Sequence, residues 1–328
     1  MERKPFLLKP TGKDYIWGGR RLNDDFAKNI DMSPLAETWE CSTHPDGPSY
    51  AANGEFAGQS LGEILKAHPD FLGQHPHTKG ELPILIKFID AKNDLSVQVH
   101  PDDDYAREHE HGQQGKSEMW YVLDAGAASQ LVYGLNHDVD AETMRRSIAN
   151  GTLEKHLQRV PIKPDDVFFI EAGTIHAIGA GSLVAEIQES SNLTYRLYDY
   201  DRVDKEGNKR PLHVDKALEV ANLKAAARPR QPMRAVKYQP GCATELLCRC
   251  RYFEVHRRLV NTERVRQLVD YRADGDSFRV LLCTNGCGSI YMEDGSYIQV
   301  FRGDCIFFPA ESVKVKIHGK LQFLDVRG

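Results

Sequence analysis

Two segments of this chain repeat one pattern, and the repeat limits the fold more than any other feature. Residues 166–172 (DVFFIEA) and 304–310 (DCIFFPA) align without gaps, and each has an acidic turn, a short apolar strand and a second turn that ends in alanine. Residues 118–123 and 277–282 form a second matching pair. Many short strands separated by turns are typical of sandwiches and barrels. The sequence therefore predicts a mainly β fold that contains one β-barrel twice.

Candidate metal ligands occur in only one of the two copies. His176 follows the first copy of the strand, whereas Lys314 holds the equivalent position after the second. Glu118 likewise has Ser277 as its counterpart. We therefore expect one barrel that carries a site and one that only packs against it or covers it.

The length of 328 residues suits two domains. Residues 224–241 are rich in proline, arginine and alanine and lack a steady period, as is typical of a connection between domains. We expect a catalytic, metal-binding domain at residues 1–240, with helical insertions and the linker. A second, degenerate barrel without metal ligands is expected at residues 241–328.

Local patterns predict a few helices among the strands. Ser60 followed three positions later by Glu63 indicates a capping box at the start of a helix over residues 60–66. Apolar residues at helical intervals predict helices at 140–159, divided at Gly151, and at 212–225. Brief apolar or β-branched runs predict strands at 82–89, 95–100, 118–123, 129–133, 166–170, 182–188, 194–199, 278–282, 289–292, 304–308 and 321–326.

The charge balance excludes some partners. The 42 basic and 47 acidic residues give a net charge of -5, which offers no electrostatic reason to bind a nucleic acid. No stretch approaches the roughly 20 apolar residues that span a bilayer, so no membrane partner is expected and the cytoplasm is the expected compartment. The seven cysteines cannot all pair, and most lie on apolar stretches, as reduced buried thiols do. The sequence does not indicate the oligomeric state.

Four residues of the first barrel offer the donor atoms that a zinc-type ion prefers. Gln98 and His100 lie two apart on a predicted strand, so both side chains point to the same face. Glu118 begins another strand, and His176 follows a turn after a third. Two imidazoles, one carboxylate and one amide leave room for water or substrate, as a catalytic site requires. We therefore expect one divalent metal ion of the zinc type at these residues.

A second pair of histidines competes for the same role. His109 and His111 lie shortly before Glu118, in a charged stretch with glycines that is typical of a helix end and loop. We favour Gln98 and His100, because a strand fixes the direction of a ligand better than a loop does.

Two basic residues lie beside the predicted ligands. Lys116 precedes Glu118 by two positions, and Arg196 lies within residues 194–202 (TYRLYDYDR). An inward arginine near a metal is costly unless an anion meets it, and a salt bridge with an acid of its own strand is the alternative. The sequence contains no phosphate loop, dinucleotide-binding glycine motif or nucleophile elbow, so these common enzyme classes lack support.

Six segments in order along the chain resemble the type I mannose-6-phosphate isomerases, zinc-dependent cupins, in their short bacterial form. They are residues 15–19 (YIWGG), 36–42 (AETWECS), 95–103 (LSVQVHPDD), 115–123 (GKSEMWYVL), 172–179 (AGTIHAIG) and 194–202 (TYRLYDYDR). Together they are specific, although each alone is modest. The part from residue 241 onward resembles the second cupin barrel of the family only in outline.

The resemblance implies roles for the candidate residues. Zinc would bind His100, Glu118 and His176, with Gln98 as a further ligand. Arg196 would be catalytic, and Lys116 would lie in the sugar-phosphate pocket. The chain departs from the family at two positions. Glu171 stands where proline is usual, so it could disturb the turn before His176 or simply face water, and His111 replaces a small polar residue.

The resemblance also implies a reaction, the interconversion of mannose 6-phosphate and fructose 6-phosphate through an enediol. A zinc ion with an open position would stabilise the negative charge that develops on oxygen. Arg196 would bind the phosphate or this oxyanion. The proton carrier would be Lys116, if burial lowers its pKa, or a metal-bound water.

Two other functions stay open at this point. An iron-dependent cupin oxygenase would use two histidines and a carboxylate in a similar way. A non-catalytic sugar-phosphate sensor could keep the pocket after losing the chemistry.

Overall fold

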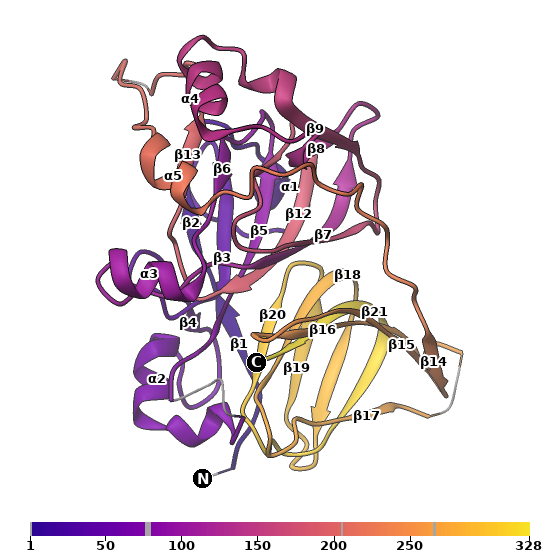
Figure 1. Ribbon diagram of the computed structural model, residues 1–328. Helices are drawn as coiled ribbons and strands as arrows, with labels where there is room; N and C mark the ends of the chain where they lie inside the picture. The colour runs from indigo at the N-terminus through magenta and orange to yellow at the C-terminus, as the bar shows by residue number, and fades with distance from the viewer. Residues whose placement is uncertain (1, 76–79, 205, 265–266) are drawn as a thin grey trace.

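The computed structural model describes residues 2–75, 80–204, 206–264 and 267–328 (Figure 1). Its strands form three antiparallel sheets, of ten, six and five strands. Short helices lie at the periphery, and the longest of those described has nine residues. The expected mainly β class is confirmed. No helix in the described ranges is long and apolar enough to cross a membrane.

The six-stranded and five-stranded sheets form the N-terminal barrel. Residues of both sheets, such as Ile89 and Trp120 on one and Leu131 and Ile178 on the other, share one buried apolar cluster, so the two sheets face each other. The order in the first sheet is β10-β7-β12-β5-β3-β2, and in the second it is β13-β6-β11-β8-β9. The strand bounds are β2(Thr11–Lys13), β3(Glu37–Cys41), β5(Ile84–Ala91), β6(Val97–Val99), β7(Glu118–Ala125), β8(Gln130–Leu135), β9(Leu157–Pro161), β10(Val167–Ile170), β11(His176–Ile178), β12(Ser182–Glu189) and β13(Tyr195–Tyr198).

The ten-stranded sheet forms the second barrel, drawn mainly in yellow in Figure 1. Strand β1(Phe6–Lys9) pairs with β20(Cys305–Phe308), so the start of the chain completes the C-terminal sheet. A boundary at residue 240 therefore does not separate the two barrels completely, because a strand from the start of the chain belongs to the C-terminal sheet. The division into two domains remains our proposal. The other strands are β4(Tyr50–Ala51), β14(Val236–Gln239), β15(Cys242–Arg249), β16(Glu254–Asn261), β17(Val269–Tyr271), β18(Arg279–Met292), β19(Tyr297–Phe301) and β21(Val315–Arg327).

The sequence repeat corresponds to equivalent strand pairs. In the first barrel β10 pairs with β7, and in the second β20 pairs with β18, both antiparallel. Ile170 lies opposite Glu118, whereas Phe308 lies opposite Arg279, two residues beyond the position that the repeat predicts. A shift of two residues leaves every side chain on its original face of the sheet.

Alternation along three strands separates the outer face of the first barrel from its interior. On β5, β7 and β12, every second residue belongs to an apolar cluster that also contains residues of the second barrel. Phe88, Met119 and Ala185 are examples, one from each strand. The neighbouring residues of each strand, among them Lys87 and Glu118, therefore point into the first barrel. The same packing fixes both the contact between the barrels and the direction of the interior side chains.

Some predicted helices are shorter than expected. Helix α2(Leu61–Ala67) begins at the predicted capping box, with the side chains and backbones of Ser60 and Glu63 joined in both directions. The helix predicted over 140–159 is correct only in its first half, α4(Ala141–Ala149). The chain turns at Gly151, whose φ is +66°, forms the 3-10 helix η2(Leu153–His156), and continues as β9. Pairing of β9 with β8 outweighs the helical spacing of its apolar residues.

Other elements also differ from the sequence predictions. Helix α5(Val214–Val220) is shorter than the predicted 212–225. The strands predicted at 278–282 and 289–292 are parts of the single strand β18, which begins at Arg279. Helices α1(Arg21–Asp24) and α3(Asp103–His109) and the 3-10 helix η1(Pro69–Leu72) were not predicted.

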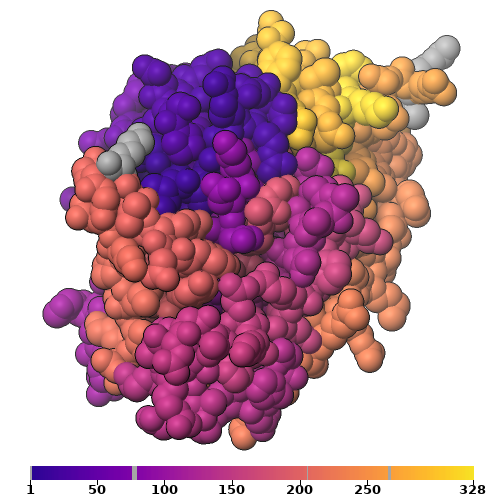
Figure 2. Space-filling model, turned by 90° about the horizontal axis from the view of Figure 1, so that it is seen from above, coloured from indigo at the N-terminus to yellow at the C-terminus, as the bar shows by residue number. Residues whose placement is uncertain are grey.

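Helices α4 and α5 cover the outer face of the five-stranded sheet. Met144 of α4 and Ala217 of α5 share a buried cluster with Val99 and Val132 of that sheet. Figure 2 shows this side of the molecule, where the magenta segment that contains α4 lies beside the orange segment that contains α5. The sheet that carries two of the predicted metal ligands is thereby shielded from solvent on its outer side.

Candidate active site

Three of the four predicted metal ligands converge inside the first barrel. The potential ligand atoms of His100, Glu118 and His176 all lie within 4.8 Å of one another. Glu118 Oε2 is 3.5 Å from His100 Nε2, and Glu118 Oε1 is 3.3 Å from His176 Nε2. All three residues are buried. In the described part of the chain no other group of three such side chains is brought together in this way.

The strand pairing brings these residues together. His176 begins β11 and lies opposite Gln98 of β6, and Glu118 begins β7 opposite Ile170. The Gln98 amide nitrogen is 3.4 Å from His176 Nε2, so this side chain lies at the edge of the group. His100 follows β6 directly. The predicted ligands thus come from adjacent strand ends that the barrel holds together.

Both imidazoles are oriented by backbone carbonyls. His100 Nδ1 donates to the carbonyl of Leu193 at 2.7 Å, and His176 Nδ1 donates to that of Thr174 at 2.8 Å. This fixes the tautomer in which Nε2 has a free lone pair, the usual arrangement of metal-bound histidine. His100 Nε2 and both carboxylate oxygens of Glu118 are buried without a hydrogen-bond partner in the structure. Such orphaned buried atoms are costly, and they fit a divalent cation.

The turn before His176 is held by backbone hydrogen bonds and does not depend on the side chain of residue 171. Gly173 has a φ of +86° and donates its N–H to the carbonyl of His100 at 2.9 Å. A Cβ on Gly173 would lie 3.0 Å from the Val220 carbonyl oxygen. Both the positive φ and this close approach therefore favour glycine here. Glu171, the departure from the family pattern, is exposed. The structure therefore places Glu171 in water while the turn is intact.

The three triad side chains have the protonation states in which they can bind a metal ion. Burial lowers the pKa of His100 to about 3, and the Lys116 charge contributes. Burial also lowers the pKa of His176. Burial would raise the pKa of Glu118, but the Lys116 charge, together with the two adjacent histidines, outweighs it and holds that pKa well below its usual value. Neutral imidazoles and an ionised carboxylate are the forms that bind a metal.

The triad lies beside a polar cavity of about 300 Å³. Lys116 is buried, lines the cavity, and places its Nζ 3.3 Å from Glu118 Oε2. Gln98 and Arg196 line it as well. The cavity is thus lined by Arg196, which the resemblance implies is catalytic, and by Lys116, which it implies lies in the sugar-phosphate pocket. Its size is at the low end for small-molecule sites.

Sequence analysis missed four charged residues that line this cavity, Glu37, Lys87, Glu186 and Arg210. Lys87 and Glu186 are both buried, and Lys87 Nζ is 3.0 Å from Glu186 Oε1. The indole N–H of Trp120 also donates to Glu186, at 3.0 Å. Burial raises the pKa of Glu186, and the Glu118 charge adds to this. The signal was available, because a single charged residue within a strongly apolar strand is costly unless it faces a polar site.

Arg196 points at the cavity without a carboxylate partner. Its Nε donates to Ser96 Oγ at 3.3 Å and its Nη1 to the Pro211 carbonyl at 2.9 Å, both neutral acceptors. Among the described residues Arg196 forms no ion pair, and Asp199 of the same segment is occupied by Arg202 and Arg210. The salt-bridge alternative raised by the sequence is therefore not what the structure shows.

The competing histidines lie outside the site. His109 ends α3 with its ring 4.2 Å from that of Tyr105, and His111 follows in a left-handed conformation with a φ of +56°. Both are exposed. The structure does not bring either of them to Glu118.

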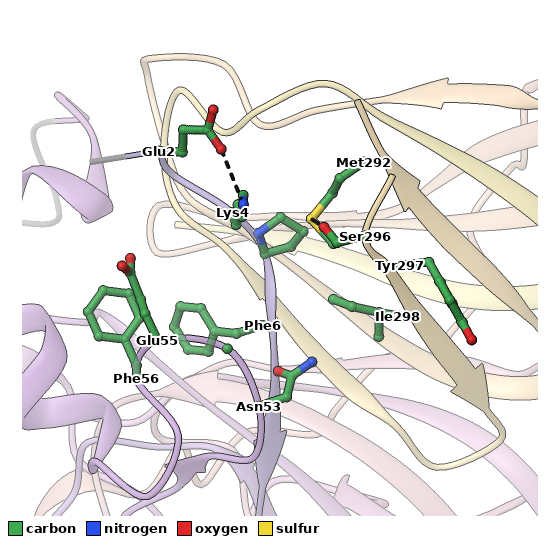
Figure 3. Close-up of a pocket in the computed structure, with 12 residues that line it drawn as sticks. Glu2, Lys4, Phe6, Asn53, Glu55, Phe56, Met292, Ser296, Tyr297 and Ile298 are labelled. Atoms are coloured by element: carbon green, nitrogen blue, oxygen red, sulfur yellow. Dashed lines mark hydrogen bonds and ion pairs between the residues drawn. The ribbon is translucent and has the colours of Figure 1, made fainter. Parts of the chain in front are cut away.

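A second cavity, of about 540 Å³, lies against the C-terminal sheet (Figure 3). Phe6, Phe56 and Ile298 supply its apolar wall. Lys4, its one lysine, is already paired with Glu2 at 3.2 Å and with Asp294 at 2.7 Å. None of the predicted site residues lines this cavity.

A buried carboxyl group supports the backbone between Lys116 and Glu118. Glu189 Oε1 accepts the N–H of Ser117 at 2.6 Å. Burial raises the pKa of Glu189 from 4.5 to about 8, and the nearby Asp103 charge contributes. The folded state therefore binds this proton more tightly than the unfolded chain, and its stabilising contribution is lost as pH rises towards 8.

We expect the variant Glu189→Gln to show a weaker pH dependence of stability. Its free energy of unfolding should fall less than that of the parent between pH 5 and pH 8, by on the order of 1–3 kcal/mol. Denaturant unfolding at a series of pH values measures this. Glu142→Gln, at an exposed acid, is the control, and identical pH profiles for parent and Glu189→Gln would contradict the assignment.

The fold and the site together define a class: a two-barrel cupin in which one barrel carries a possible metal-binding triad beside a polar cavity. A family model described as phosphomannose isomerase type I, catalytic domain, matches residues 6–124. The probable mannose-6-phosphate isomerase GmuF of Bacillus subtilis (strain 168) is 36% identical over 98% of both chains. Mannose-6-phosphate isomerase ManA of the same organism is 36% identical over 97% of both.

A solved structure gives the same answer. The crystal structure of mannose 6-phosphate isomerase from Bacillus subtilis matches with a TM-score of 0.90 and 33% identity, over 98% of this chain and 99% of that one. The chain therefore belongs to the type I phosphomannose isomerase family, and the expected family and enzyme class are confirmed.

Proposed function

We propose that this protein interconverts D-mannose 6-phosphate and D-fructose 6-phosphate through an enediol, with one zinc ion held by His100, Glu118 and His176 and by Gln98 as a further ligand. The observation that carries the proposal is the convergence of His100, Glu118 and His176 beside a polar cavity, with His100 Nε2 and both Glu118 oxygens buried without a hydrogen-bond partner. GmuF and ManA, the relatives that match over almost their full length, are both named as mannose-6-phosphate isomerases, which supports the same substrate.

The cavity residues suit the transfer of a proton between C1 and C2 of an open-chain sugar. The metal position would supply Lewis-acid chemistry, which polarises a carbonyl and stabilises negative charge on its oxygen. Arg196, fixed by Ser96 and by the Pro211 carbonyl, presents a charge that no carboxylate neutralises. Its guanidinium would stabilise the developing oxyanion. The indole of Trp120 and the buried walls around it limit the access of water.

Lys116 is our proposed proton carrier, because it is buried within 3.3 Å of Glu118 and lines the cavity. Glu186 is its competitor, since a carboxyl with a raised pKa also suits proton transfer near neutral pH. We expect Lys116→Met to stop exchange of the substrate C2 hydrogen with solvent, with Glu186→Gln retaining exchange at a reduced rate. Loss of exchange in Glu186→Gln alone would transfer the role to Glu186. Mass spectrometry of substrate in deuterated water measures it.

A coupled isomerase assay tests the proposed function. Purified protein should convert mannose 6-phosphate, lose this activity on chelation, and regain it when zinc is added back. Oxygen consumption should stay at background throughout, whereas metal-dependent oxygen uptake would favour an oxygenase. Binding of mannose 6-phosphate without turnover in the zinc-loaded protein would instead indicate a sensor.

A further inference from the structure

A group of three arginines and one aspartate gathers where β13 ends, and we name these residues, Arg196, Asp199, Arg202 and Arg210, the rim cluster. Asp199 accepts hydrogen bonds from Arg210 Nε at 2.8 Å and from Arg210 Nη2, through its other oxygen, at 2.6 Å. Arg202 Nη2 binds Asp199 at 2.5 Å. Burial would raise the pKa of Asp199, but these bonds outweigh it and hold the pKa below its usual value. The carboxylate thus stays ionised and orients both arginines.

The rim cluster carries more positive than negative charge. Its three guanidinium groups face one carboxylate, which leaves two positive charges uncompensated. Arg202 and Arg210 have side chains that are 20% and 25% exposed, so these charges are only partly solvated. Positive charge that is partly removed from water favours an anion nearby.

The other charged residues that line the same cavity balance one another. Glu37 and Glu186 contribute two carboxylates against the two ammonium groups of Lys87 and Lys116, all of them buried. The excess positive charge at the cavity therefore comes from the rim cluster. An anionic group of a ligand is expected beside that cluster.

Arg196 and Arg210 both line the cavity but are anchored differently. Arg196 is paired in register with Gln98, beside the candidate metal ligands, and its Nε reaches Ser96. Arg210 comes from the segment after β13 and lines the cavity from there. One edge of its guanidinium, Nε and Nη2, is held by Asp199, and its Nη1 has no hydrogen-bond partner within the described part of the chain.

We propose that Arg210, oriented by Asp199, binds the phosphate group of the sugar phosphate, and that it selects phosphorylated over unphosphorylated sugars. The inference rests on the proposed function and deepens it. A phosphate monoester carries a charge of about −1.5 to −2 at pH 7, which matches the excess charge of the rim cluster. An oriented guanidinium with a free edge is well suited to phosphate oxygens.

Steady-state kinetics of Arg210→Gln tests the proposal. The KM for mannose 6-phosphate should rise about 10- to 100-fold, the loss expected for one charge-assisted bond. The kcat should stay within about threefold, because the phosphate is carried on C6 and the proton moves between C1 and C2. Arg210→Lys should recover part of the loss. Lys209→Gln is the matched control, since it removes the neighbouring positive charge, which is exposed, pairs with Asp201 and does not line the cavity.

Binding measurements separate this inference from the proposed function. Calorimetry on the zinc-loaded protein should show that Arg210→Gln weakens the binding of mannose 6-phosphate and of inorganic phosphate by similar factors. The binding of unphosphorylated mannose should not change. An equal weakening of mannose binding, or a fall in kcat with an unchanged KM, would overturn the proposed role of Arg210. A parent protein that binds mannose 6-phosphate through Arg210 but does not isomerise it would refute the proposed function and leave the phosphate site standing.

Discussion

The variant Glu118→Gln will lose bound metal and nearly all turnover. Glu118 is the one carboxylate of the triad, and its two oxygens face His100 Nε2 and His176 Nε2 at 3.5 and 3.3 Å. An amide keeps the shape of the side chain but removes the only negative charge of the triad, which strengthens the binding of a divalent ion. If the metal supplies several kcal/mol of transition-state stabilisation, turnover should fall on the order of 1,000-fold. Metal analysis by mass spectrometry and the coupled assay measure both effects.

A matched control distinguishes loss of metal from loss of folding. Glu245 is also buried and is ion-paired with Arg257, but it lies in the second barrel. Glu245→Gln should lower the free energy of unfolding of the metal-free protein, as Glu118→Gln does, because each substitution removes a buried carboxylate that is paired with a cation. It should retain metal and turnover. Full metal content in a folded Glu118→Gln protein would remove Glu118 from the ligand set.

The variant Arg196→Ala will keep its metal and lose most of its turnover. The Arg196 guanidinium is held by Ser96 and by the Pro211 carbonyl, and it contacts none of the three triad residues. Removing one oriented donor to a developing oxyanion typically costs about 100- to 1,000-fold in kcat. The expected result is therefore normal zinc content with kcat reduced by that factor.

Arg145→Ala is the control for Arg196→Ala, because Arg145 is exposed and pairs with Asp215 on the surface. It should match the parent in both zinc content and kcat. Normal turnover in Arg196→Ala would remove Arg196 from the mechanism, and loss of zinc in that variant would make its role structural.

The contrast between Arg196 and Arg210 follows from where each is anchored. Arg196 belongs to a strand that pairs with the strand carrying Gln98, whereas Arg210 is held by Asp199 beyond the end of that strand. Arg196→Ala is expected to lower kcat, whereas Arg210→Gln is expected to raise KM. The two together test whether the cavity has a reacting end and a phosphate end.

Parts of the site could be predicted from sequence because they depend on local order. Strand alternation put Gln98 and His100 on one face, and the repeat singled out Glu118 and His176. The structure brings His100, Glu118 and His176 together. Ser60 and Glu63 predicted the start of α2 for the same reason, since a capping box is a contact between close neighbours.

The features that sequence analysis missed depend on pairing between distant segments. Strand β1 pairs with β20, almost 300 residues away in the chain, and no local pattern specifies that partner. The helix predicted through residue 159 is interrupted because β9 pairs with β8. Lys87 and Glu186 are recognisable as a pair only when β5 and β12 lie side by side, in register at these two residues.

The second barrel supports the first although its strand repeat has no ligands at the positions of Glu118 and His176. Its residues Val280 and Phe307 share a buried cluster with Phe88 and Met119, on the outer face of the strands that carry Lys87 and Glu118. Dense packing of one face fixes the direction of the other. This contact explains physically why a barrel without those ligands would be retained beside the site.

Anomalous X-ray diffraction at the zinc absorption edge, on crystals of the zinc-loaded protein, tests the central claim most directly. We predict one strong anomalous peak within the first barrel, bonded to His100 Nε2, Glu118 and His176 Nε2, and absent from crystals treated with a chelator. An active, zinc-loaded protein with no peak at these three side chains, or with its peak elsewhere, would contradict the account.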